Sequence, residues 1–197
     1  MAEPVIPDFG EASDCVTENR LFCPDWVREN WDPVLQPALV QHIYLTAIAV
    51  GVGFVISVGA ALLAHRLSHV ERPFAFLAAV IYTIPSLALF QLLVPVTGLT
   101  VTTVEIALVS YTVLILFRNT LAGLRVAVVS TIALATVAAF VVSKGLGGPI
   151  LGALRLDFRT EIIVAGALAV GLAIIADVLL VLVERVVTPW AATRRTA

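Results

Sequence analysis

Four long stretches of this sequence contain almost no charged residue, and this constrains the fold more than any other feature. Ala38–Ala64, Phe74–Val104 and Val126–Ser143 contain no Asp, Glu, Lys or Arg, and Ile162–Val183 contains only Asp177. A helix needs roughly 20 apolar residues to cross a hydrocarbon core of about 30 Å. Its backbone hydrogen bonds are then satisfied within the helix. The sequence therefore predicts an all-α, polytopic helical membrane protein.

About five transmembrane helices are expected within the 197 residues. A soluble protein of this size would need amphipathic helices with a charged face, and these segments have almost no charge on any face. The hydrophobic content of 60% agrees with the membrane class. The predicted spans are Ala38–Ala64, Phe74–Val94, Thr102–Phe117, Val126–Val142 and Ile162–Val183.

Charge is distributed unevenly along the chain. The net charge is −2, which gives no general attraction for nucleic acid. Residues 1–36 hold eight acids and two bases, so the acidity is concentrated before the first span. We therefore divide the chain into an acidic head outside the membrane (1–37), a transmembrane domain (38–186) and a cytoplasmic tail (187–197).

Arginine placement predicts the orientation, because short cytoplasmic loops carry an excess of Arg and Lys. The connections after the first and third spans and the segment after the fifth each hold Arg, whereas 95–101 holds no base. The N-terminus is therefore expected outside a bacterial plasma membrane and the C-terminus inside it. The connection 143–161 does not fit this orientation, because it holds Lys144 and two arginines on the predicted outer side. No signal peptide is recognised, so the first span is expected to direct insertion.

The head contains both cysteines of the chain, Cys15 and Cys23. A pair with this spacing in an oxidising compartment is a disulfide candidate, and two free thiols are the alternative. Metal binding is not expected, because no histidine or second cysteine pair is nearby. The apolar strip from Trp26 to Leu35 predicts a short helix along the outer membrane surface.

Two breaks interrupt the apolar segments. Pro85 lies inside the second predicted span, where it predicts a kink that either serves packing or turns polar backbone towards a cavity. The glycine-rich segment 145–149 is expected to be a flexible break outside the membrane.

Asp177 is the one acid well inside a predicted span, and an ionisable residue there is a functional candidate by default. The alternative is a structural ion pair with an inner arginine such as Arg118 or Arg66. Nothing in the sequence matches a phosphate-binding loop or a zinc-protease motif, and no paired carboxylates share a span. The chain is not expected to be an enzyme, and no cofactor is predicted.

Several segments together resemble one family of transport proteins. Tyr82–Leu89 reads Y-T-I-P-S-L-A-L, and R-N-T follows at 118–120. With them the chain resembles the permeases of osmoprotectant ABC importers, which carry glycine betaine, choline or carnitine. The resemblance continues through 105–108, Tyr111, 126–139, 145–147, 157–166 and 188–190.

This resemblance implies the fold and the partners. The fold is the helical bundle of ABC importer permeases (MetI-like), and transport proceeds by alternating access at a dimer interface. The partners are an ABC ATPase subunit, an extracytoplasmic solute-binding protein, a second permease subunit and the lipid membrane, without nucleic acid. Residues expected near the translocation pathway or its inner gate are Thr83, Pro85, Ser86, Arg118, Asn119 and Asp177.

One departure from the family concerns the connection between the third and fourth spans. The family has a cytoplasmic coupling loop there, with an E-A-A…G segment that docks into the ATPase. Here 118–125 reads R-N-T-L-A-G-L-R and leads directly into the next apolar run. We therefore predict weak or absent coupling to the ATPase. Two alternatives remain from other classes: a membrane scaffold that does not transport, and a small ion-coupled carrier that uses Asp177.

Overall fold

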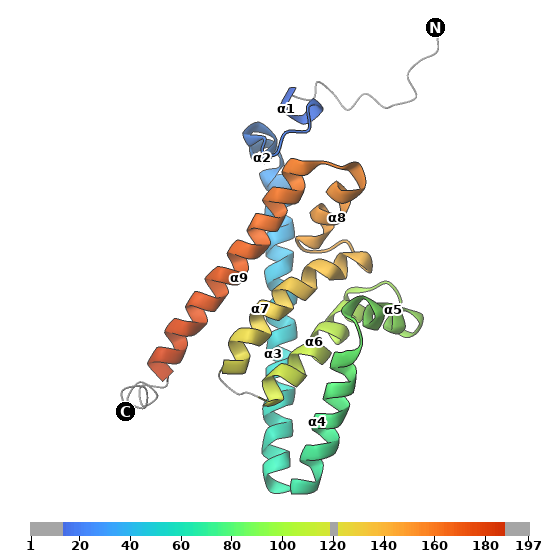
Figure 1. Ribbon diagram of the computed structural model, residues 1–197, viewed down its shortest axis with the longest axis vertical. Helices are drawn as coiled ribbons and strands as arrows, with labels where there is room; N and C mark the ends of the chain where they lie inside the picture. The colour runs from blue at the N-terminus through green and yellow to red at the C-terminus, as the bar shows by residue number, and fades with distance from the viewer. Residues whose placement is uncertain (1–13, 119–121, 188–197) are drawn as a thin grey trace.

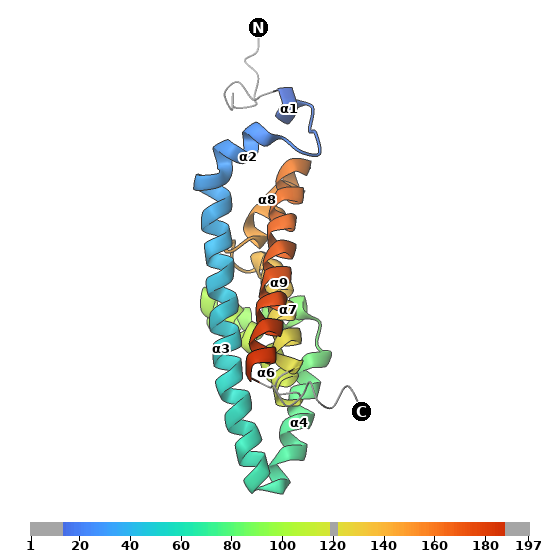
Figure 2. The ribbon, with the colours of Figure 1, turned by 90° about the vertical axis from the view of Figure 1, so that its left-hand side faces the viewer.

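The computed structural model describes residues 14–118 and 122–187. This part of the chain contains helices and no strand. Short α1 (Asp14–Thr17) and α2 (Pro24–Asn30) precede the π-helical turn η1 (Trp31–Leu35), which contains Pro33. Because proline lacks a backbone N–H, it interrupts the α-helical ladder at this turn. Figure 2 shows α2 lying across the end of the bundle at an angle to the helix that follows.

The first predicted span is one long helix, α3 (Gln36–Arg66), and the fifth is α9 (Arg159–Val187). By length and composition these two helices are sufficient to cross a membrane. Many large apolar side chains on both are exposed, as expected for surfaces that face lipid.

The second predicted span is bent at Pro85, where the sequence predicted a kink. The segment forms α4 (Ser68–Thr83) and α5 (Ser86–Thr97), which are bent by 101° at Pro85. The third and fourth predicted spans are the shorter apolar helices α6 (Val101–Arg118) and α7 (Ala122–Val137), the latter continued by η2 (Ala138–Phe140). All five predicted spans are thus helical. Among the described residues, two helices are long and apolar enough to cross a membrane, or three spans result if the bent pair is counted as one.

The core lies where α3, α5, α6 and α7 meet. Phe90, Val104, Leu108 and Ala135 are among its fully or almost fully buried residues. Gly53 allows α3 to approach α6 closely, because a Cβ there would lie 2.7 Å from Thr112 Cγ2. Thr112 in turn shares a 3.0 Å hydrogen bond with Thr131 of α7. Small residues and hydroxyls therefore join these three helices, as is common inside membranes.

The remaining helix, α8 (Gly147–Leu156), lies between η2 and α9 and packs on both. The last helix, α9, also packs on α7. Figure 1 shows α9 beside α2 and α8 at its first turns and diverging from α3 towards its last turns. The hairpin of α3 and α4 extends beyond the ends of α6, α7 and α9 in both views (Figures 1 and 2).

Candidate functional site

The predicted pathway residues around Pro85 occupy the break between α4 and α5. Ile84 is extended (φ −72°, ψ 126°), and Pro85 precedes the first turn of α5. The Tyr111 hydroxyl of α6 donates a hydrogen bond to the Ile84 carbonyl oxygen. Thr83 Oγ1 donates to the Val80 carbonyl oxygen at 2.7 Å. The break therefore has its freed backbone oxygen satisfied by a neighbouring helix, as membrane helices require.

The predicted pathway residues are not brought together. Thr83, Pro85 and Ser86 lie at the junction of α4 and α5, which pack on α6, whereas Asp177 lies on α9, which packs on α7 and α8. Arg118 is the last residue of α6. Asn119 lies outside the described residues, as do residues 1–13 of the head and 188–197 of the tail.

Asp177 forms an ion pair, but with a different partner from those expected. Arg125 of α7 holds it in a bidentate contact, with Nε donating to Oδ1 at 2.8 Å and Nη2 to Oδ2 at 2.9 Å. The ion pair with an arginine agrees with the structural alternative, but the partner is Arg125 and not Arg118 or Arg66, which were named as examples. Arg125 had been placed in a loop, whereas α7 begins at Ala122 and carries Arg125 on its first turn. Parallel N–H···O bonds of this kind fix both the position and the orientation of the two groups.

This ion pair lies in an open groove of about 780 Å³ between α7 and α9. The side chains of Arg125 and Asp177 are 37% and 36% exposed. The walls are mostly apolar, with Ser130 and Glu184 adding polar groups. Residues that line it include Val126 and Val129 on α7 and Val170 and Ile174 on α9. We call this feature the α7–α9 groove.

The opposite end of α9 is held by the head. Cys15 and Cys23 form a disulfide with Cα atoms 5.8 Å apart, and the loop that they close carries Asn19. Asn19 Nδ2 donates to the Asp157 carbonyl oxygen at 2.6 Å, and Asn19 Oδ1 accepts from the Arg159 N–H at 2.9 Å. The Thr160 hydroxyl donates to the Arg20 carbonyl oxygen at 2.8 Å.

We call these contacts the head clasp. The rings of Trp26 and Phe158 pack edge to face beside it, with centroids 5.0 Å apart. Both Asn19 (φ 49°) and Asp157 (φ 52°) are left-handed, a conformation that Asn and Asp tolerate better than most residues. The clasp thus joins the head to the beginning of α9.

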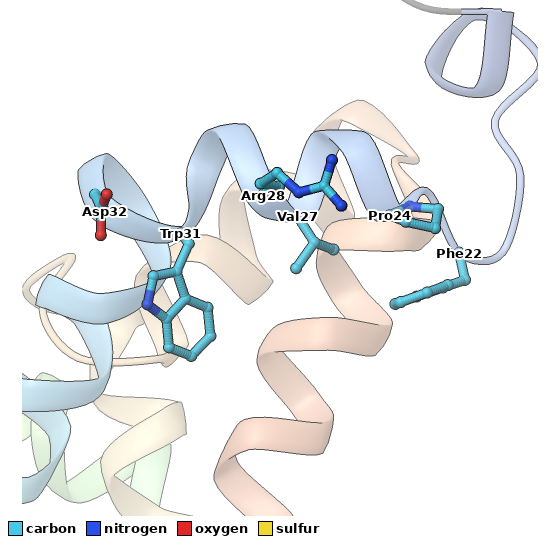
Figure 3. A pocket seen from close by; sticks show the side chains of 6 residues that line it. All are labelled: Phe22, Pro24, Val27, Arg28, Trp31 and Asp32. Atoms are coloured by element: carbon cyan, nitrogen blue, oxygen red, sulfur yellow. The ribbon is translucent and has the colours of Figure 1, made fainter.

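A shallower groove of about 400 Å³ lies along α2 in the head. Figure 3 shows Val27 and Trp31 below α2 and Arg28 extending along the helix. Apolar and charged side chains therefore line this groove together. The location of α2 at the outer surface stays a prediction.

The glycine-rich segment after η2 is anchored rather than flexible, which corrects the expectation for 145–149. Buried His42 accepts a hydrogen bond from the Leu146 N–H at Nδ1 (3.2 Å), and its Nε2 lies 2.9 Å from the Ile132 carbonyl oxygen. These contacts require a neutral imidazole with the proton on Nε2. A Cβ on Gly147 would lie 2.1 Å from the Thr136 carbonyl oxygen, so this position admits only glycine.

Nothing in the described part of the chain indicates a metal centre. No group of three or more His, Cys, Asp or Glu side chains is placed there to hold a metal ion. The Arg125–Asp177 pair instead places a positive and a negative group side by side in the α7–α9 groove.

No protein-family model matches this sequence. Curated proteins do match it. The glycine betaine/carnitine/choline transport system permease protein OpuCB of Bacillus subtilis is 28% identical, over 76% of this chain and 86% of the relative. The curated homologues of this chain are osmoprotectant transport permeases. The resemblance predicted from the sequence motifs is thereby confirmed.

Two further relatives extend the comparison to other genera. The carnitine transport permease protein OpuCB of Listeria monocytogenes is 27% identical, over 77% of this chain and 87% of the relative. The osmoprotectant import permease protein OsmW of Salmonella typhimurium is 29% identical, over 76% of this chain and 89% of the relative. These homologues favour an importer permease over the scaffold and the ion-coupled carrier.

The alignment lengths reveal a deficit inside this chain. The match to the Bacillus subtilis permease runs over 188 residues, whereas 76% of 197 residues is about 150. About 38 aligned positions, the difference between 188 and 150, therefore have no counterpart here. The relatives contain a segment or segments that this chain lacks.

Proposed function

We propose that this chain is a membrane-spanning permease subunit of an ABC importer for quaternary ammonium osmoprotectants such as glycine betaine, choline or carnitine. The observation that carries the proposal is the similarity to such permeases from three genera across three quarters of the chain. Helices apolar and long enough to cross a membrane support it. Transport would proceed by alternating access.

The proposed partners are those of the family. An ABC ATPase hydrolyses ATP on the cytoplasmic side, a solute-binding protein delivers the solute outside, and a second permease subunit completes the pathway. The N-terminal head lies outside and the C-terminal tail in the cytoplasm. The head clasp supports an outer location for the beginning of α9, because a disulfide is stable in an oxidising compartment.

We assign two parts of the chain to the pathway. Thr83, Pro85 and Ser86 border it where α4 and α5 break, with Arg118 and Asn119 at the inner end of α6. Asp177 belongs to a separate part, the α7–α9 groove, with Arg125 as its partner. A permease dimer would have to bring these two parts to one path.

The connection between α6 and α7 is too short to dock an ATPase by the family's coupling loop. Only three residues separate Arg118 from Ala122. The ends of α6 and α7 also stop short of the α3–α4 turn (Figure 1). An ATPase changes the permease equilibrium only through contacts that differ between states. The chain is therefore coupled weakly or not at all, unless the second permease subunit supplies the contact.

Affinity purification from native membranes tests both statements. A bound solute-binding protein or second permease with no ATPase supports a coupling-deficient importer subunit. A stoichiometric ATPase bound to a homodimer of this chain would contradict the coupling deficit and leave the permease function intact. The matched variant inserts a relative's coupling segment between Arg118 and Ala122 and is expected to recover ATPase binding. A folded chain that binds none of the three partners would overturn the proposed function.

A further inference from the structure

The Arg125–Asp177 pair differs from a purely structural ion pair in its exposure. Charged groups inside a membrane are costly and normally face a partner or a cavity. Here each side chain is satisfied by the other and still presents about a third of its surface, 37% and 36%, to the α7–α9 groove. A contact that only joined two helices would be expected to lie between them, covered on both sides.

The bidentate contact does not use every hydrogen-bonding group of either partner, and Glu184 of the same groove also attracts Arg125 electrostatically. Arginine carries five N–H donors. The contacts to Asp177 use Nε and Nη2, so the Nη1 donors are not engaged by Asp177. A carboxylate has about four acceptor sites, of which this contact uses two. N–H donors of Arg125 and carboxylate acceptors of Asp177 that this contact does not use therefore lie side by side in one groove.

The groove walls determine which kind of ligand can bind to these donors and acceptors. Valine, isoleucine and alanine side chains from α7 and α9 form most of the lining, and Glu184 adds a second carboxylate. Apolar walls suit methyl groups, whereas paired opposite charges suit a molecule that carries both signs. The described lining contains no aromatic ring, so recognition by an aromatic cage is not available there.

We propose that the α7–α9 groove is a low-affinity binding subsite for zwitterionic quaternary ammonium solutes, in which Arg125 receives the carboxylate and Asp177 the trimethylammonium group. This inference rests on the proposed function, which supplies the solute class. The two charges of such a solute lie opposite those of the ion pair, so neither partner is left with an unbalanced charge in an apolar groove. A cation without a carboxylate, such as choline, can use only the Asp177 side.

The affinity is low because the charges are partly exposed. Exposed ion pairs are screened by water, so each lost charge contact is expected to weaken binding by no more than about fivefold. A subsite along a transport path benefits from such weakness, because the solute must also leave it.

The first test uses the unmodified chain in nanodiscs of phosphatidylethanolamine and phosphatidylglycerol. Phosphatidylcholine is avoided because its headgroup is itself a quaternary ammonium zwitterion. Binding is measured for glycine betaine, for choline and for 3,3-dimethylbutanoate, which replaces the positive nitrogen of glycine betaine by carbon. Glycine betaine is expected to bind more tightly than either of the other two, by up to about fivefold. Equal affinities, or no saturable binding, would overturn the inference.

The second test uses Arg125→Gln and Asp177→Asn, which keep hydrogen-bonding amides of similar size. Arg125→Gln should lower the preference for glycine betaine over choline, whereas Asp177→Asn should weaken choline more than 3,3-dimethylbutanoate. Arg155→Gln, an exposed arginine on α8 outside this groove, is the control. A structural pair would instead weaken all three ligands together, or none of them. Partner purification is scored separately, so a chain that keeps its partners and binds no solute loses only this inference.

Discussion

The two ends of α9 are held by different kinds of contact. At its beginning, the head clasp uses neutral hydrogen bonds at the protein surface, and the nearby His42–Leu146 contact is a neutral hydrogen bond that is buried. Near its other end, the described contact with α7 is an ion pair at the edge of an open groove of about 780 Å³. Figure 1 shows the same contrast in shape, because α9 lies close to its neighbours at the clasp and diverges from α3 beyond it.

The difference indicates which end of α9 can move. A buried polar group that loses its partner costs about 1–3 kcal/mol, so the buried His42–Leu146 contact resists opening near the beginning of α9. The disulfide also limits the movement of the loop that carries Asn19. An exposed ion pair can exchange its partner for water or solute at little cost. We therefore expect α9 to pivot about the clasp, with the groove opening and closing at its far end.

Gly147→Ala, on α8 beside the beginning of α9, should destabilise the protein most severely. The new Cβ would lie 2.1 Å from the Thr136 carbonyl oxygen, a backbone atom that cannot move without moving α7. We expect a loss of about 3 kcal/mol in unfolding free energy and little folded protein. Gly152→Ala on the same helix meets nothing within 4 Å and is the matched control. Yields of monodisperse protein and thermal unfolding compare the two, and similar behaviour of both variants would argue against tight packing here.

His42→Leu should produce the next largest effect. The substitution removes the acceptor of the buried Leu146 N–H and the donor to Ile132. We expect a loss of about 2 kcal/mol, together with faster amide exchange around Leu146. His65→Leu makes the same chemical change at an exposed position of α3 and should leave both quantities unchanged. Hydrogen exchange that is equally fast in the two variants would contradict a structural role for His42.

Asn19→Asp should loosen the clasp with a smaller effect. The new carboxylate oxygen replaces the Nδ2 donor and faces the Asp157 carbonyl oxygen, while the acceptor for the Arg159 N–H remains. We expect a loss of about 1 kcal/mol and increased hydrogen exchange at 157–160. Asn19→Gly keeps the left-handed backbone but removes both contacts, so it should increase exchange at least as much. Protection of this turn in both variants would show that the disulfide loop alone maintains the clasp.

Segment length and hydropathy predicted the helical class and the approximate positions of all five apolar segments, because these depend on local composition. The size of the bend at Pro85 was not predictable in this way. The Ile84 carbonyl oxygen at the break accepts a hydrogen bond from Tyr111, which lies 27 residues further along the chain. A proline indicates that a ladder bond is lost, but it does not say which neighbour will replace it.

The candidate site shows a similar division. An acid inside a span predicted a charged partner, and Asp177 has one. The partner itself was missed because the start of α7 was placed after Arg125. The clasp had no local signal at all, since Asn19 and Asp157 are 138 residues apart in the sequence. Contacts of this range follow from the packing of helices, which composition does not specify.

A substitution at Asp177 in the α7–α9 groove should change the stability of the protein least. Asp177→Asn keeps one acceptor for Arg125 and removes a charge from a site that is already 36% exposed. Its unfolding temperature should therefore change less than that of Asn19→Asp, and the double variant Arg125→Gln/Asp177→Asn should be no less stable than either single variant. Spin labels on the last turns of α9 should nevertheless show a broader distance distribution to α3 in Asp177→Asn. The opposite result would be a distance distribution as narrow as in the parent chain, or a larger loss of stability in Asp177→Asn than in Asn19→Asp. In that case the ion pair holds α9 more firmly than the head clasp does, and α9 pivots about the groove instead.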